Sequence, residues 1–184
     1  MTRRKPKLLS SKIVHKNPWY CVRHDKLIWP DNSRGEYFVM ELPDGIIMIA
    51  EQDQKLLLVE QHRYTLKTSS LEFCTGGLNK RETILHGAKR ELQEETGYEA
   101  HRLRTIGSFE ALNGITPHRM HVVVTDHLRQ KKDDLEPSEY DLRVRWIPIS
   151  KWRQCIQRGK IGDGPTLAAW TIYQAWKATK KDSP

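Results

Sequence analysis

The stretch that decides the fold is "CTGGLNKRETILHGAKRELQEETGYEA", which runs from Cys74 to Ala100. Its apolar residues recur every four positions, at Ile84, Ala88 and Leu92. This spacing predicts an amphipathic helix that begins near Glu82 or Thr83. Gly97 follows the last apolar turn and predicts the helix end, because glycine adopts the left-handed conformation at little cost.

Glutamates gather in this predicted helix, although the chain has a formal net charge of +8. Since each helical residue advances by about 100°, Glu91 and Glu95 share one face and Glu94 lies roughly 60° away. Like charges four residues apart on a helix destabilise it by a few tenths of a kcal/mol. A favourable interaction with another group should therefore offset this repulsion. Arg90 precedes Glu94 by four residues and can form an ion pair with it.

Two interpretations fit the cluster of carboxylates. A run of charges on a helix is commonly a solvated face. Alternatively, the carboxylates bind a divalent cation together with a backbone carbonyl of the preceding loop, where Gly76 and Gly77 permit close backbone approach. Carboxylate and carbonyl oxygens are hard ligands that suit Mg²⁺ or Mn²⁺. The position of the helix, directly after a strand and a Gly-Gly loop, favours the cation site.

The rest of the chain predicts many strands and two more helices. Apolar or alternating runs predict strands at 12–17, 19–29, 36–42, 46–50, 55–64, 103–112, 120–128 and 142–149. Residues 36–64 have the spacing of a three-stranded meander, and 65–70 read as a polar loop. A short helix is expected from Ser150 as N-cap, and a closing helix at 165–181. This order predicts a mixed sandwich of the α+β class.

Composition narrows the class of protein further. The 184 residues fit one domain, or one domain with a small extension. The apolar runs are too short to span a bilayer, and the N-terminus lacks the apolar region of a signal peptide. Three scattered cysteines without metal-type spacing favour the cytoplasm. Lys and Arg cluster near the chain ends without interleaved aromatics, so solubilising charge is favoured over nucleic-acid binding.

At this point the residues resemble a known family. Gly76, Glu82 and the run "RELQEETGY" at 90–98 look like a complete Nudix box, with every defining position filled. The segments "LLLVEQHRY", "SLEFCTGG" and "NPWYCVRHDKL" are similar to the ADP-ribose and nucleoside diphosphate sugar branch of that superfamily. Together these segments extend the resemblance over most of the chain.

The resemblance implies a fold and an assembly. The expected fold is an α/β/α sandwich with a mixed sheet, formed by residues 43–184, preceded by a small β subdomain at 1–42. In relatives of this branch the small subdomain exchanges between two subunits, which implies a homodimer. Trp19 or Trp29 would then lie near the interface.

The resemblance also implies a reaction and a metal site. It implies hydrolysis of the diphosphate linkage of a nucleoside diphosphate sugar, such as ADP-ribose or GDP-mannose, to a nucleoside monophosphate and a sugar phosphate. Glu91 and Glu95 would be the principal ligands of Mg²⁺ or Mn²⁺, with Glu94 and the Thr75 carbonyl completing the set. Arg90 would hold the glutamates in place.

Substrate contacts are expected outside the box. Arg63 matches a position that contacts the diphosphate in the branch, and a guanidinium fork suits phosphate oxygens. Glu72 either serves the site or pairs with a neighbouring Arg. Trp19 is a candidate for stacking on the base, although large aromatics in small domains are more often core or interface residues.

The general base is less clear from the sequence. The branch places a glutamate in a pattern like Ser-Pro-Gly-x-x-x-Glu-Arg, whereas the segment at 111–120 reads "ALNGITPHRM". Here His118 stands where the glutamate would be, and it can act near neutral pH. Glu139, from the next loop, is the preferred candidate, and Glu94 is a further one. Glu110 and Glu136 follow behind them.

Two other functions remain open from the sequence. One is cleavage of RNA 5′ ends or dinucleoside polyphosphates, which the basic surface would favour. The other is a Nudix-fold ligand sensor without activity, against which the intact box argues.

Overall fold

The computed structural model describes residues 4–131 and 141–181. The chain divides into two compact units. The first comprises residues 1–43 together with 110–119, and the second comprises residues 44–109 and 120–184.

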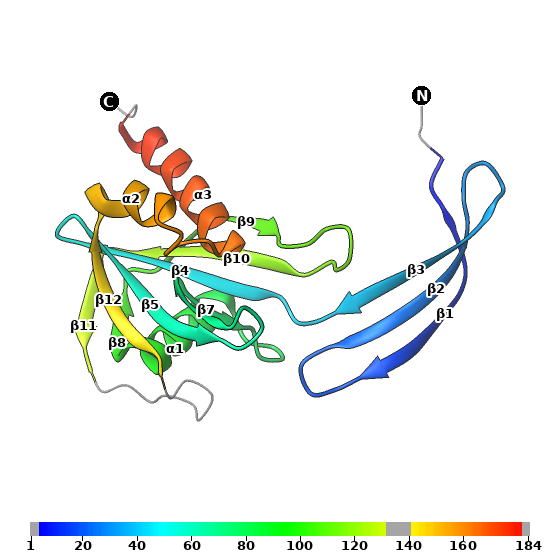
Figure 1. The fold of residues 1–184 in the computed structure, drawn as a ribbon, viewed down its shortest axis with the longest axis horizontal. Helices are drawn as coiled ribbons and strands as arrows, with labels where there is room; N and C mark the ends of the chain where they lie inside the picture. Colours follow the sequence, from blue (N-terminus) through cyan, green and yellow to red (C-terminus); the bar gives the residue numbers. More distant parts are fainter. Residues whose placement is uncertain (1–3, 132–140, 182–184) are drawn as a thin grey trace. The chain divides into compact units, whose positions relative to one another are not determined.

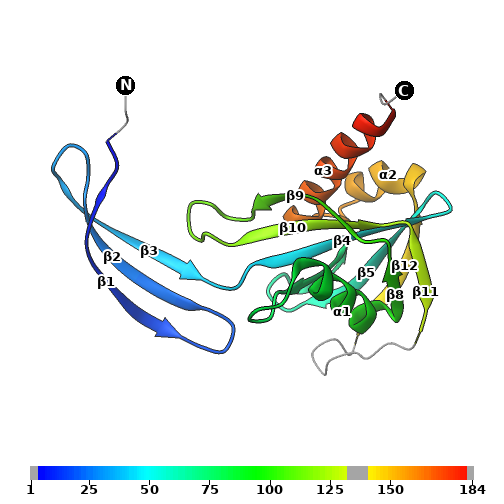
Figure 2. The same ribbon diagram turned by 180° about the vertical axis from the view of Figure 1, so that it is seen from behind.

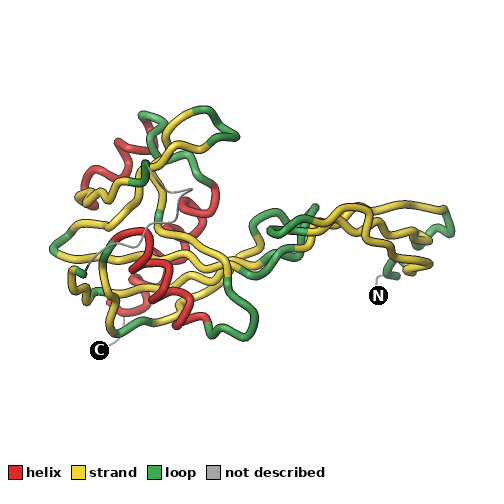
Figure 3. The backbone as a smooth tube through the Cα atoms, turned by 90° about the horizontal axis from the view of Figure 1, so that it is seen from below, coloured by secondary structure: helices red, strands yellow, loops and turns green. Residues whose placement is uncertain are grey.

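The first unit is built on a three-stranded antiparallel sheet with the order β1-β2-β3. Figure 3 draws the strands of the chain in yellow. Its strands are β1 (Lys7–Lys16), β2 (Cys21–Ile28) and β3 (Arg34–Glu41). The β1–β2 turn is fixed by Asn17, whose Oδ1 accepts hydrogen bonds from the backbone N–H groups of Trp19 and Tyr20, both at 2.9 Å. Every residue of β1 is exposed. The segment 110–119 joins this unit through a backbone bond from Met40 N to Ile115 O of 2.9 Å.

The second unit contains a seven-stranded mixed sheet (Figure 1). Its main order is β12-β5-β4-β10-β9, with β6 paired to β5 and β7 paired to β4. The strands are β4 (Gly45–Gln52), β5 (Lys55–Arg63), β6 (Thr68–Glu72), β7 (Cys74–Gly77), β9 (Arg104–Glu110), β10 (Arg119–Thr125) and β12 (Arg143–Pro148). A separate two-stranded sheet pairs β8 (Tyr98–His101) with β11 (His127–Gln130).

The central strand β4 is where the sheet forks. On one edge β10 runs parallel to it over Gly45–Ala50. On the other edge β7 pairs with its first half, residues 45–48, and β5 pairs with its second half, residues 50–52. Beyond the fork β5 pairs with β6 instead. The fork therefore leaves room for β6 and β7, and β7 is the beginning of the decisive stretch.

Helices cover both faces of this sheet (Figures 1 and 2). One face carries α1 (Ile84–Thr96), and the other carries α2 (Trp152–Gln157), which follows the 3₁₀ turn η2 (Ile149–Lys151), and α3 (Gly164–Lys181). Residues 45–50 of β4 are all buried, as expected for a strand covered on both sides. The predicted α+β sandwich with a mixed sheet is confirmed.

Three details of the predicted elements are wrong. The expected meander over 36–64 is interrupted, because β3 stays with β2 while β4 starts the second sheet. Only Tyr64–Lys67 form a turn, since Thr68 and the residues after it pair with β5 despite their polar side chains. Ser150 is not an N-cap: the turn η2 begins at Ile149, whose N–H is bound to the Gln54 carbonyl at 3.0 Å.

The described helices include none that is long and apolar enough to cross a membrane.

Candidate active site

The decisive stretch folds as a loop followed by α1, with its ends fixed by local chemistry. Thr83 is the N-cap, and its side chain accepts a hydrogen bond from the backbone N–H of His86 at 3.3 Å. Gly97 ends the helix at φ 69°, and its N–H donates to the Gln93 carbonyl at 2.9 Å. Both predicted ends of the helix are confirmed. Its inner face packs closely on the loop, because Gly87 is buried and a methyl group there would lie 2.8 Å from Leu78 Cδ2.

Arg90 is the centre of the charged cluster. Its Nη1 donates to Glu91 Oε1 at 2.9 Å and to Glu94 Oε2 at 2.8 Å, which confirms the predicted Arg90–Glu94 ion pair. Its Nε and Nη2 donate to the two oxygens of Glu82, each at 3.0 Å. Nη2 also donates to the Gly77 carbonyl at 3.1 Å. One guanidinium thus ties the loop to two acidic residues of the helix.

Glu82 completes the bracing of the loop. Besides Arg90, its carboxylate accepts the backbone N–H of Asn79 at 3.0 Å and contacts His86 Nδ1 at 2.9 Å. The side chain is 7% exposed. The hydrogen bonds from Arg90, followed by those from Asn79 and His86, lower the pKa of Glu82 to about 2 against the cost of burial. Glu82 is therefore an ionised structural anchor at neutral pH.

Gly76 is packed against a carboxylate. A methyl group built on Gly76 would overlap the carboxylate carbon and both oxygens of Glu91, whereas one built on Gly77 would meet nothing within 4 Å. The Gly76 backbone therefore lies directly against the Glu91 carboxylate, and neither glycine needs a positive φ. Thr75 precedes this contact and pairs with Ile47 of β4. A side chain at position 76 would have to displace the Glu91 carboxylate, so space and not backbone conformation favours glycine there.

Glu95 lies on the buried side of α1, beside a second charged group. It is 5% exposed, and its charge helps to raise the pKa of Arg63. The main cause of that rise is the hydrogen bonding of Arg63 to Glu72: Nε donates to Glu72 Oε1 at 3.0 Å, and Nη2 contacts Oε2. Glu72 is 3% exposed. Of the two expectations for Glu72, pairing with a neighbouring Arg is thus the one seen.

The sequence reasoning did not select Asp163, which also faces Arg63. Its charge adds to the rise in the Arg63 pKa, and its Oδ2 accepts the backbone N–H of Thr166 at 2.8 Å in the first turn of α3. Thr166 Oγ1 in turn accepts the buried backbone N–H of Phe73 at 3.1 Å. The signal available in the sequence was Asp163 three residues before Thr166, an N-cap spacing.

The other candidate residues belong to the first unit or fall outside the described residues. Trp19 is in the β1–β2 turn of the first unit and is 76% exposed. His118, also in the first unit, contacts the Pro43 carbonyl through Nδ1 at 2.7 Å, so the neutral ring carries its lone pair on Nε2. Glu110 pairs with Arg119 at 3.0 Å. Glu136 and Glu139 fall within 132–140, outside the described residues.

The donor set of the cluster has the chemistry of a divalent-cation site. Glu91, Glu94 and Glu95 offer carboxylate oxygens only, and the space beside Gly76 is kept open for one of them, which fits a hard cation. Within residues 4–131 and 141–181, however, no three His, Cys, Asp or Glu side chains are spaced as a ready-made cluster. Arg90 occupies the position of counter-ion to Glu91 and Glu94. Glu91, Glu94 and Glu95 would hold such a cation through their carboxylate oxygens.

Both the N-terminal strands and the rest of the chain are similar to known protein families. A family model described as NUDIX domain matches residues 42–168, and one described as nucleoside diphosphate sugar hydrolase N-terminal domain matches residues 6–40. An ADP-ribose pyrophosphatase of Bacillus subtilis is 27% identical over 81% of this chain and 82% of its own. A methanol dehydrogenase activator of Bacillus methanolicus is 28% identical over 85% of each chain.

More distant relatives extend over nearly the whole chain. The ADP compounds hydrolase NudE of Escherichia coli is 21% identical over 94% of this chain and 93% of its own. A crystal structure of an ADP compounds hydrolase superposes with a TM-score of 0.87, covering 98% of both chains at 18% identity, and so shares the fold. With an assembled box, this fold and a NUDIX model over more than half of its length, the chain belongs to the Nudix family.

Proposed function

We propose that this chain is a divalent-metal-dependent pyrophosphohydrolase that cleaves the diphosphate linkage of ADP-ribose or a related nucleoside diphosphate sugar. The products would be a nucleoside monophosphate and a sugar phosphate. The observation that carries the proposal is the Arg90 network, which joins Glu82, Glu91, Glu94 and the Gly77 carbonyl around the loop. The names of the relatives, which include two hydrolases of ADP compounds, favour adenine over guanine.

The metal would be held by Glu91, Glu95 and Glu94, with the Thr75 carbonyl as a further donor. When bound, a divalent cation neutralises diphosphate charge and stabilises the leaving phosphate. Nudix hydrolases generally need such a cation, and oxygen ligands suit both Mg²⁺ and Mn²⁺. We favour Mg²⁺ as the physiological ion.

The residues of the chain position the substrate and handle its charge. Arg63 presents a guanidinium that Glu72 holds in one orientation, and its fork would bind diphosphate oxygens. Water attacks one phosphorus atom, the bond to the bridging oxygen breaks, and that oxygen leaves on the second phosphate. Arg63 stabilises the charge that develops in this step.

A general base must take the proton from the attacking water, an effect typically worth about 10²–10⁴-fold in rate. We retain Glu139 as the first candidate for this base. His118 is the second, because it stands where the branch carries its glutamate and imidazole is a common general base. Glu94 is the third, since its carboxylate remains one-third exposed.

A substrate panel tests the proposal. ADP-ribose, GDP-mannose, diadenosine polyphosphate and 5′-triphosphate RNA are incubated with the full chain in Mg²⁺, Mn²⁺ or EDTA, and products are resolved by anion-exchange chromatography. We expect AMP and ribose 5-phosphate from ADP-ribose in either metal and none in EDTA. Preferred cleavage of the RNA or the polyphosphate would favour the alternative activities, and no turnover of any compound would favour a ligand sensor.

Glu95→Gln locates the reaction at the proposed site. It removes one ligand charge while keeping the side-chain volume, so the loss in kcat should exceed the roughly 10–100-fold that follows from losing a group that only supports a ligand. Glu99→Gln is the matched control, because the Glu99 carboxylate pairs with Lys89 and Lys131, outside the Arg90 network. Equal turnover in both variants would exclude Glu95 from the site.

The proposal includes a homodimer formed through the first unit. Apolar side chains at about half exposure or more lie on its strands and turn: Leu8, Leu9, Ile13, Val14, Trp19 and Phe38. Leu9 and Val14 fall at two irregularities in the pairing of β1 with β2, between Leu8 and Ser10 and between Ile13 and His15. A three-stranded sheet with this many exposed apolar side chains needs cover, which a second copy can supply.

The proposed location is the cytoplasm. Cys21, Cys74 and Cys155 are all free thiols, which suits a reducing compartment.

A further inference from the structure

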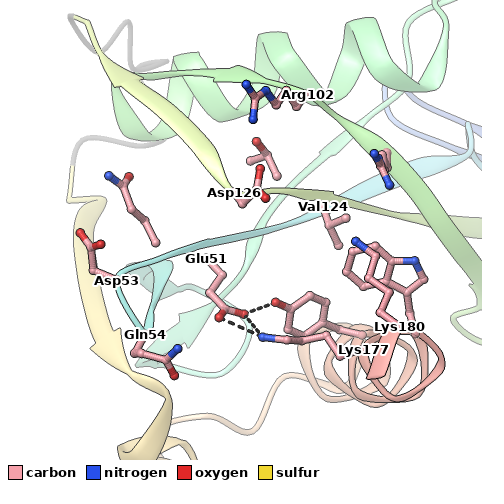
Figure 4. A pocket seen from close by; sticks show the side chains of 13 residues that line it. Glu51, Asp53, Gln54, Arg102, Val124, Asp126, Lys177 and Lys180 are labelled. Carbon is pink, nitrogen blue, oxygen red and sulfur yellow. Dashed lines mark hydrogen bonds and ion pairs between the residues drawn. The ribbon is translucent and has the colours of Figure 1, made fainter. Parts of the chain in front are cut away.

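A second cavity lies in the second unit, away from the Nudix box. Its volume is about 490 Å³, and none of the residues of the loop and α1 line it. It is formed by the β4–β5 turn, the segment leading into β9, the end of β10 and the last turns of α3 (Figure 4).

The floor of this cavity is fixed by a buried acid. Lys177 Nζ donates to the two oxygens of Glu51 at 2.9 and 2.7 Å, and the Tyr173 hydroxyl donates to the same carboxylate (Figure 4). Burial, followed by the contact with Glu51, raises the pKa of Tyr173, so the phenol stays neutral. The Glu51 side chain is 15% exposed. This floor is therefore rigid, and its two charges cancel.

Besides the Glu51–Lys177 pair, three further cations line the walls of the cavity. Among the described residues, Arg102, Arg104 and Lys180 make no ion pair with a carboxylate within 4.0 Å. Arg102 and Arg104 are exposed, and the Lys180 ammonium lies 4.0 Å from the centre of the Trp176 ring. Three cations beside one cavity attract an anionic group and can each donate charge-assisted hydrogen bonds to it.

The cavity has two chemically different ends. In Figure 4, Lys180 lies at one end, whereas Asp53 and Gln54 lie at the other. Asp53 and Gln54 accept hydrogen bonds from hydroxyl or amino groups. Asp126, between the ends, repels a second anionic group. The lining thus selects a ligand with a single anionic group at one end and hydrogen-bond donors at the other.

We propose that this cavity is a second binding site, for a small organic phosphate of the mononucleotide or sugar phosphate class. Arg102, Arg104 and Lys180 supply the contacts to its phosphate, and its hydroxyl or amino groups face Asp53 and Gln54. A volume of about 490 Å³ lies within the range of ligand pockets, about 300–1,000 Å³.

Calorimetry with the full chain in EDTA tests this site without any turnover. The probes are AMP, ribose 5-phosphate and inorganic phosphate, which separate a nucleotide, a sugar phosphate and a bare anion. We expect AMP or ribose 5-phosphate to bind at least tenfold more tightly than inorganic phosphate. Equal affinity for all three would mean an adventitious ion only and would overturn the proposal, as would the absence of binding.

Variants assign the binding to the cavity. Arg104→Gln with Lys180→Gln should weaken it at least tenfold, whereas Arg129→Gln with Lys151→Gln removes the same charge from exposed positions outside the cavity and should leave it unchanged. Arg63→Ala, in the proposed active site, should also leave it unchanged. Loss of binding in Arg63→Ala with full binding in the cavity variant overturns the proposal. Because no hydrolysis is measured, this result is independent of the proposed function.

Discussion

At the scale of single residues, the adjacent loop glycines Gly76 and Gly77 differ in how much space surrounds them. Gly76→Ala should displace Glu91, because the added methyl group overlaps its carboxylate. A displacement of about 1 Å at a reacting centre costs on the order of 100-fold in rate, which we expect for kcat. Gly77→Ala is the matched control, since its methyl group meets nothing within 4 Å. Steady-state assays in which both variants lose activity equally would contradict this difference.

Glu82 links the stability of the loop to pH. Its pKa is about 2 in the folded chain against 4.5 ordinarily, so its contribution to stability is fully present above pH 4.5 and is lost as the pH falls toward 2. Glu82→Gln should therefore lower the free energy of unfolding at pH 7, and the difference from the parent should shrink between pH 4.5 and 2. Urea unfolding over this range measures it; a constant difference would refute the linkage.

The residue-level predictions succeeded where spacing alone defines a contact. The Arg90–Glu94 pair follows from four-residue helical spacing, and the ion pair is present. Arg63 and Glu72 lie on neighbouring strands, so the sequence left two roles open for Glu72. Asp163 was missed because it approaches Arg63 through tertiary folding, a hundred residues later in the chain, where no local pattern reports the contact.

At the scale of elements, α3 anchors the strand that leads into the loop. Thr166→Val keeps the volume but removes the acceptor of the buried Phe73 N–H, which should cost about 1–3 kcal/mol of unfolding free energy. Thr171→Val on the same helix is the control, with an expected change within about 0.5 kcal/mol, because Thr171 is exposed. Urea unfolding measures the free energy of unfolding of both variants. Similar losses in both would mean that the hydrogen bond of the Phe73 N–H does not contribute to stability.

Elements were predictable where local chemistry agrees with tertiary packing. The helix α1 has an N-cap, an apolar stripe and a glycine end, and all three hold. Residues 68–70 form the first part of β6 and not the expected loop, because backbone pairing with β5 overrides their polar side chains. Ser150 failed as a cap because the Gln54 carbonyl, distant in sequence, starts the turn one residue earlier.

At the scale of the whole molecule, the exposed apolar residues of the first unit lead to a prediction about assembly. Ile13→Glu places a charge on β1 at a side chain that is 55% exposed in the single chain. If a second copy covers this strand, the variant should be monomeric while the parent has twice the mass of one chain. Thr171→Glu adds the same charge on α3 and should stay dimeric. Light scattering after gel filtration measures both; a monomeric parent would remove the dimer.

The sequence predicted the class of the fold but not how its parts connect. Strand positions and the mixed sandwich follow from apolar patterns. The parallel pairing of β10 with β4, across seventy-odd residues, and the grouping of 110–119 with the first unit do not. Both depend on long-range contacts, which leave no periodic signal in the chain.

Arg90 gives the protein a counter-ion of its own, covalently attached and always charged. When a chelator strips the site, the guanidinium remains beside Glu91 and Glu94, so their repulsion stays screened. Removal of the metal should therefore abolish activity but leave the fold nearly unchanged. We expect EDTA to shift the melting temperature by no more than about 2 °C. If scanning calorimetry instead showed a much larger fall in the melting temperature, the metal would be required for the stability of the fold. An apoprotein already braced in this way can be reloaded repeatedly, without refolding around each new ion.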